Sequence, residues 1–159
     1  MSEKFSADQI AERVSHIVDE RTALEGPLLP ILHAVQEELG HVPETALRTI
    51  ADKLNLSRAE VHGVASFYHD FRENPAGRHT IKVCRAEACQ AMNGERLAAE
   101  LRAALKLDWN DTTADGSVTL EPVYCLGLCA CAPALLVDGR PVGRLNHERL
   151  DTIVSEVRA

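Results

Sequence analysis

Residues 118–129 read VTLEPVYCLGLC, and residues 80–89 read TIKVCRAEAC. Each stretch begins with the pattern of a β-strand, rich in β-branched and apolar residues, and ends in a pair of cysteines. If the two strands are neighbours in one sheet, both cysteine pairs emerge at the same end of that sheet. Four thiolates would then converge on one point, which makes this the candidate functional site of the chain.

The four cysteines of these stretches are Cys84, Cys89, Cys125 and Cys129, with the spacing Cys-x4-Cys and Cys-x3-Cys. Two pairs fit a 2Fe–2S cluster, because each of its two irons takes two thiolates. A structural zinc site is the main rival, although zinc knuckles usually use a narrower Cys-x2-Cys pair. A thiol–disulfide enzyme would carry Cys-x-x-Cys, which is absent from the sequence. Buried cysteines without a function are the remaining alternative, so spacing favours iron–sulfur and leaves zinc open.

Gly127 and Cys131 lie next to these cysteines in the sequence, and a role can be predicted for each. Gly127, between Cys125 and Cys129, allows the backbone to approach a cluster or to adopt a positive φ. Backbone N–H groups can then point at sulfur and stabilise the more negative, reduced state. The fifth cysteine, Cys131, follows only two residues after Cys129, and we expect it to lie near the site without being a ligand.

The composition is that of an ordinary globular chain, with 159 residues, 45% hydrophobic and 26% charged. The longest apolar stretch, residues 132–137, is far too short to cross a bilayer, so we expect no membrane insertion. The first ten residues lack the apolar core of a secretory signal. These features predict a cytoplasmic protein, in which five cysteines serve metal or redox chemistry rather than disulfides.

The net charge of −7 is concentrated in the first half, where residues 1–75 carry 13 acidic and 7 basic side chains. The sequence has no basic patch to neutralise phosphates, and we expect no nucleic-acid binding. The acidic surface either keeps a solvated helical face soluble or steers a basic protein partner towards the chain.

Helical signals fill residues 1–75. Ser6 with Gln9, and Ser57 with Glu60, form capping boxes that predict the starts of two helices. A further helix is expected over residues 28–39, where Gly40 ends it, and another from Pro43 to about Asn55. The sequence therefore predicts an N-terminal four-helix segment.

The polar stretch 72–78, RENPAGR, predicts a boundary between a helical bundle over residues 1–75 and a second domain over residues 76–159. In the second domain we expect strands at 80–84, 118–124, 134–137 and 141–145, and helices at 95–107 and after an Asn146 cap. Asp138-Gly139 predicts a hairpin turn, and Pro141 places the last strand at an edge. This order predicts a small α/β layer, a sheet covered by helices.

Three segments resemble one known family: GHVPETALRTIADKLNLSRAEVHGVASFYHDF at 40–71, the Cys84-x4-Cys89 pair, and CLGLCACAPALLVDGRPVG at 125–143. They are similar to the thioredoxin-like 2Fe–2S subunits of NADH-oxidising complexes, which include respiratory complex I, NAD-reducing hydrogenases and NAD-dependent formate dehydrogenases. Within that family, CRAEACQAMNG at 84–94 most resembles the gamma subunit of the molybdenum-containing formate dehydrogenase.

The resemblance implies an α/β fold with a four-helix segment followed by a thioredoxin-like 2Fe–2S domain. It implies that Cys84 and Cys89 hold one iron, and Cys125 and Cys129 the other. It also implies a partner flavoprotein that carries FMN and the NAD site, and a separate subunit that carries the molybdenum cofactor. The chain itself would be a non-catalytic electron-transfer subunit of formate dehydrogenase, or the equivalent subunit of an NAD-reducing hydrogenase or of complex I. Thioredoxins carry a cis proline before the third strand, so the Ala132–Pro133 bond is expected to be cis.

Two functions of other classes stay open, an independent ferredoxin-like carrier and a zinc-stapled assembly module without a redox role. Phe67, Tyr68 and Phe71 cluster at the end of a helix, where they form either a contact with the second domain or a partner interface. The seven histidines are scattered, and we expect them to have surface or capping roles. They are His16, His33, His41, His62, His69, His79 and His147.

Overall fold

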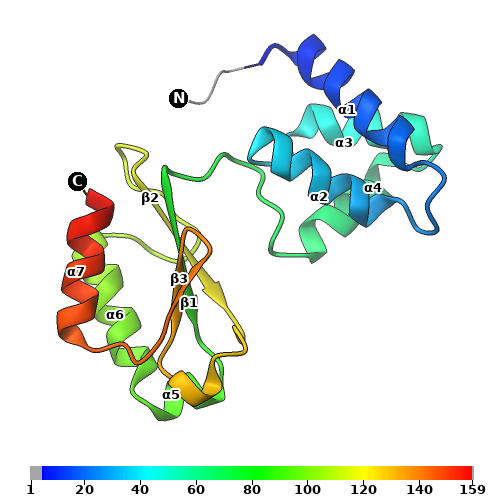
Figure 1. The fold of residues 1–159 in the computed structure, drawn as a ribbon. Helices are drawn as coiled ribbons and strands as arrows, with labels where there is room; N and C mark the ends of the chain where they lie inside the picture. Colours follow the sequence, from blue (N-terminus) through cyan, green and yellow to red (C-terminus); the bar gives the residue numbers. More distant parts are fainter. Residues whose placement is uncertain (1–4, 159) are drawn as a thin grey trace. The chain divides into compact units, whose positions relative to one another are not determined.

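The structure is a computed structural model that describes residues 5–158. The chain divides into two compact units, Met1–Pro75 and Ala76–Ala159. The first unit is helical and the second combines helices with a sheet (Figure 1). The expected α/β class is therefore confirmed.

The first unit consists of α1 (Ala7–Arg21), α2 (Leu28–Leu39), α3 (Glu44–Leu54) and α4 (Arg58–Phe67). Both capping boxes form: the Ser6 Oγ accepts from the Gln9 N–H at 3.3 Å, and the Ser57 Oγ accepts from the Glu60 N–H at 3.2 Å.

Left-handed residues end α2 and α3, with φ of 78° at Gly40 and 54° at Asn55. Apolar side chains three and four residues apart line the inner stripe of each helix. Together they form the core of the first unit: Val14, Ile17, Val18, Ile31, Leu32, Val35, Val42, Ala46, Leu47, Ile50, Ala51 and Val61.

The sheet of the second unit has the order β2-β1-β3-β4. Its strands are β1 (His79–Cys84), β2 (Val118–Val123), β3 (Leu135–Val137) and β4 (Arg140–Val142). β1 pairs in parallel with β2 and antiparallel with β3, and β3 pairs antiparallel with β4. β4 lies at an edge, as Pro141 predicts, and Asp138-Gly139 makes the turn before it with φ of 51° and 78°.

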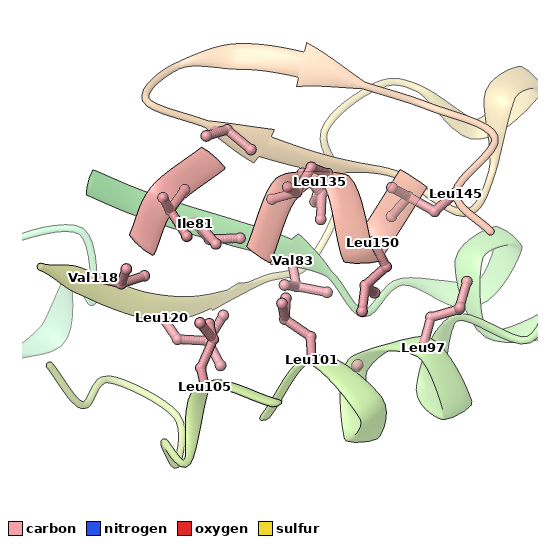
Figure 2. Packing of buried hydrophobic residues seen from close by; sticks show 14 residues of the cluster. Ile81, Val83, Leu97, Leu101, Leu105, Val118, Leu120, Leu135, Leu145 and Leu150 are labelled. Carbon is pink, nitrogen blue, oxygen red and sulfur yellow. The ribbon is translucent and has the colours of Figure 1, made fainter. Parts of the chain in front are cut away.

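Two long helices, α6 (Gly94–Leu105) and α7 (His147–Arg158), lie on the same side of this sheet (Figure 1). Figure 2 shows how Leu97, Leu101 and Leu105 of α6 approach the strand residues Val83 and Leu120. This apolar layer is continuous from α6 and α7 to the strands, so it fixes the sheet on which the cysteines stand.

The remaining elements are short and were not predicted. They are helix α5 (Glu87–Ala91) and the 3₁₀ helix η1 (Cys129–Cys131). Two elements end earlier than the sequence predicts. Helix α6 ends at Leu105 and not at residue 107, because Lys106 has a φ of 57°. Strand β4 ends at Val142 and not at residue 145, two residues before Arg144, which has a φ of 51°.

Two other local predictions are confirmed. The side-chain Oδ1 of Asn146 accepts from the Arg149 N–H at 2.9 Å, so it caps α7. The Ala132–Pro133 peptide bond is cis.

Candidate metal centre

Both cysteine pairs lie at one end of the sheet. β1 and β2 are parallel and in register, with Cys84 opposite Val123, so the chain leaves both strands at the same edge. In Figure 1, α5 and the gold-coloured turn at residues 129–131 are both drawn at this end of the sheet. The two cysteine pairs therefore emerge at the same end of the sheet, as the two strand-plus-cysteine stretches predict.

The first pair is buried. Cys84, the last residue of β1, is 5% exposed, and Cys89 in α5 is 2% exposed. The backbone N–H of Cys84 donates to the carbonyl of Ala134 at 3.1 Å, which ties the end of β1 to the start of β3. These three residues form a small apolar cluster, so the first pair is held in the interior of the fold.

The second pair is exposed and lies on a short loop. Cys125 follows β2 with a φ of 124°, and Cys129 begins η1. Their Sγ atoms lie 3.9 Å apart. A tetrahedral metal with a metal–sulfur distance of about 2.3 Å, the value for zinc, needs two sulfurs about 3.8 Å apart. This pair therefore has the spacing required to bind one tetrahedral metal ion.

Gly127 shapes the loop between the second pair as the sequence predicts. Its φ is 73°, in the left-handed region that favours glycine. In this conformation its backbone N–H points to the Sγ of Cys125 at 3.4 Å. An N–H group directed at a thiolate stabilises negative charge on that sulfur.

Hydrogen bonds also link the two loops. Burial by itself would raise the pKa of the Cys84 thiol, but hydrogen bonds bring this pKa below its usual value. The donors include the backbone N–H groups of Ala86, Leu126 and Cys125. Leu126 and Cys125 belong to the exposed loop, so backbone N–H groups of that loop reach the sulfur of Cys84.

Two other thiols, Cys89 and Cys129, have a pKa above the usual value. Burial, followed by its hydrogen bond with Cys84, raises the pKa of Cys89 to about 11. The hydrogen bond with Cys125 raises the pKa of Cys129. Metal binding therefore has to displace these protons, and cluster assembly releases them.

The thiols form two pairs rather than one compact group. Within residues 5–158, no three His, Cys, Asp or Glu side chains are close enough to share a single metal ion. A 2Fe–2S cluster asks each iron for only two protein thiolates, and the cluster's sulfides bridge the two irons. One buried pair and one exposed pair at the same sheet end fit that donor set.

Cys131 lies beyond these pairs, at the end of η1, and is half-buried. Its backbone carbonyl accepts from the Arg144 N–H, at 2.6 Å. The structure thus places Cys131 against the segment after β4. That it is not a ligand stays a prediction.

A family model described as thioredoxin-like [2Fe-2S] ferredoxin matches residues 14–158. The chain belongs to this family. Its cofactor is accordingly a 2Fe–2S cluster, which decides between the iron–sulfur and zinc alternatives that cysteine spacing left open.

Relatives of this ferredoxin are named as parts of larger oxidoreductases. This chain is 38% identical to a subunit of the NADH-quinone oxidoreductase of Pseudomonas aeruginosa over 129 residues, which is 81% of this chain and 75% of the relative. It is 32% identical to the HndA subunit of the NADP-reducing hydrogenase of Solidesulfovibrio fructosivorans, over 83% of this chain and 77% of the relative.

A solved structure is similar as well. A chain of an NAD⁺-reducing [NiFe]-hydrogenase in the H2-reduced state superposes with a TM-score of 0.70 and 29% identity. The match covers 82% of this ferredoxin but only 22% of the hydrogenase chain.

Two histidine rings of the second unit have carboxylate partners: His79 pairs with Asp138 at 2.8 Å, and His147 with Glu100 at 2.6 Å. Phe71 packs on the core of the first unit, whereas Phe67 is 73% exposed. For the exposed aromatics, a contact with the second unit and an interface with a partner both stay predictions. In residues 5–158, no helix combines the length and apolar character needed to cross a membrane.

Proposed function

We propose that Cys84, Cys89, Cys125 and Cys129 hold the cluster, the first two on one iron and the last two on the other. The arrangement of the two parallel strands supports this assignment, because it brings two thiol pairs to one end of the sheet. The Sγ separation of 3.9 Å between Cys125 and Cys129 supports their pairing on one iron.

The cluster gives the chain the chemistry of a one-electron carrier. The residues of the chain supply the asymmetry around it: the first pair is buried among apolar side chains, and the second is open to solvent. Electrons therefore enter and leave through the surface around Cys125 and Cys129. The chain is a non-catalytic redox subunit, and substrate chemistry takes place on its partners.

The partner next to the cluster is a flavoprotein with FMN and an NAD site, in a cytoplasmic complex. The assembly is an NAD-dependent formate dehydrogenase, with formate oxidised at a molybdenum cofactor on another subunit. The resemblance of residues 84–94 to the gamma subunit of that enzyme supports this choice. The names of the relatives support the equivalent place in an NADH-quinone oxidoreductase or a hydrogenase as the alternative.

The cluster is tested on the anaerobically purified chain. We expect about two irons and two acid-labile sulfides per chain, a brown colour, and an EPR signal that appears on reduction. Serine variants of the four ligands should lose iron, whereas Cys131→Ser should keep it. A colourless protein with one zinc per chain would refute the proposed function.

The assembly is tested by purifying the tagged chain from its native host. Co-purification of FMN and molybdenum with formate-dependent reduction of NAD⁺ is the expected result. Nickel in place of molybdenum would identify a hydrogenase, and neither metal together with quinone reduction would point to respiratory complex I. A chain that purifies alone with an intact cluster would indicate an independent carrier.

A further inference from the structure

Two glycines near the cysteines have no conformational reason to be glycine. Gly94 is the first residue of α6, and Gly143 follows β4. Neither has φ in the left-handed region, in contrast to Gly127. Alanine is the better helix former, so helix propensity does not favour glycine at residue 94. The space around them explains both residues.

Gly94 packs directly against the backbone of Cys89. A Cβ atom at residue 94 would lie 2.5 Å from the carbonyl oxygen of Cys89 and 2.8 Å from its carbonyl carbon. Both residues are buried, and the obstacle is backbone rather than a flexible side chain. Any side chain at residue 94 therefore has to push α5, and with it the thiol of Cys89.

Gly143 has the same relationship to the second pair. A Cβ atom there would lie 2.7 Å from the Cβ of Cys131 and 2.9 Å from its carbonyl oxygen. Cys131 belongs to the turn that starts at Cys129, and the Arg144 N–H holds its carbonyl. A side chain at residue 143 therefore displaces η1 and moves Cys129.

We propose that Gly94 and Gly143 are positioning residues for the cluster, one for each thiol pair. The absence of a side chain at these two positions sets where Cys89 and Cys129 stand relative to the other two thiols. This inference rests on the ligand set proposed above. It predicts that one added methyl group at either position changes the cluster while the fold persists.

The test uses Gly94→Ala and Gly143→Ala in the full chain, with two matched controls. Gly63→Ala in α4 meets nothing within 4 Å. Gly77→Ala is the structural control, since its Cβ would lie 2.9 Å from the backbone N of Val118, at the start of β2 and so away from the cysteine end. It strains the same sheet without touching a cysteine segment.

Three quantities are measured for each variant: thermal unfolding of the cluster-free chain, the EPR g-values of the reduced cluster, and the rate of cluster loss to an iron chelator. For Gly94→Ala and Gly143→Ala we expect folded chains, shifted g-values and at least a several-fold faster loss of iron. For Gly77→Ala we expect a lower melting temperature with unchanged g-values. For Gly63→Ala we expect unchanged g-values and an unchanged rate of iron loss, with an equal or higher melting temperature, because alanine is the better helix former.

Wild-type g-values and wild-type rates of iron loss in both alanine variants would overturn the inference and leave the cluster assignment standing. A variant whose cluster-free chain does not fold would overturn it for that glycine, since the effect would then be global. If Gly77→Ala shifted the g-values equally, general strain of the sheet would replace local positioning as the explanation. Failure of the proposed function looks different, because the wild-type chain would then carry no cluster.

Discussion

The backbone N–H of Gly127 lies 3.4 Å from the Sγ of Cys125, and it can point there because the φ of Gly127 is 73°. This contact involves the exposed pair, where solvent also stabilises negative charge. Hydrogen bonds to sulfur favour the reduced cluster, because reduction adds one negative charge. With the proposed ligands, the loop thus contributes to the reduction potential as well as to metal binding.

Substitution of Gly127 by alanine should make the midpoint potential more negative. A left-handed φ costs a non-glycine residue about 1–2 kcal/mol, so the loop relaxes and the N–H turns away from Cys125. The potential shifts by the part of the hydrogen bond that stabilises only the reduced cluster; a loss of about 1 kcal/mol there corresponds to tens of millivolts, since about 59 mV is a tenfold change in a one-electron equilibrium. A redox titration followed by EPR measures it. Gly63→Ala is the control, and a potential equal to that of the wild type would contradict the prediction.

Replacement of Cys131 by serine should leave the cluster in place, whereas Cys129→Ser should weaken or abolish it. The two residues share one 3₁₀ turn, so the pair of variants compares a proposed ligand with its nearest non-ligand. The visible spectrum and iron content of each purified variant give the answer. A bleached Cys131→Ser protein would mean that the ligand set has been assigned wrongly.

The second unit should become less stable in acid, because protonation removes the charge of the Asp138 carboxylate. Burial by itself would raise its pKa, but hydrogen bonds from the His79 ring and the Thr80 N–H hold this pKa below its ordinary value. Because the folded-state pKa is the lower one, the stabilisation is present above the unfolded value of about 3.9 and is lost as pH falls through the folded pKa.

The matched variant for this prediction is Asp138→Asn. Asparagine tolerates the positive φ at residue 138 and can still accept from the Thr80 N–H, so it removes mainly the charge. The free energy of unfolding, measured in urea, should fall more steeply for the wild type than for the variant between about pH 4 and pH 3. Parallel pH profiles of the two proteins would show that this carboxylate does not contribute.

Removal of the cap of α4 should destabilise the first unit alone. Ser57→Ala loses the Oγ that accepts from the Glu60 N–H, and such a loss costs about 1 kcal/mol of unfolding free energy. Ser66→Ala, at an exposed position on the same helix, should change stability by less than about 0.5 kcal/mol. Chemical denaturation of both variants measures the difference, and equal effects would argue against the cap.

Local signals carried most of the fold prediction. The capping boxes at Ser6 and Ser57 and the left-handed ends at Gly40 and Asn55 act within one helical turn, so a single sequence reveals them. The five-residue helix α5 escaped prediction because it has no side-chain cap and is too short for a periodic pattern. Its position comes from burial of Cys89, a tertiary effect.

The site could be predicted only in part for the same reason. Strand patterns indicated that Cys84 and Cys125 stand at strand ends, and the parallel pairing of β1 with β2 is present. Which pair is buried, and the contacts of Gly94 and Gly143, depend on segments that meet only after folding. Independent folding of residues 1–75 and 76–159 as two domains stays a prediction.

The parallel pairing of β1 and β2 also has a consequence for biosynthesis. Parallel neighbours cannot be joined by a tight turn, and here α6 makes the crossover between them. A nascent chain thus exposes Cys84 and Cys89 well before Cys125 and Cys129 have been translated. With the proposed ligands, iron delivery has to wait until the ribosome has passed residue 129, and an assembly factor that acts earlier would find only half of a site.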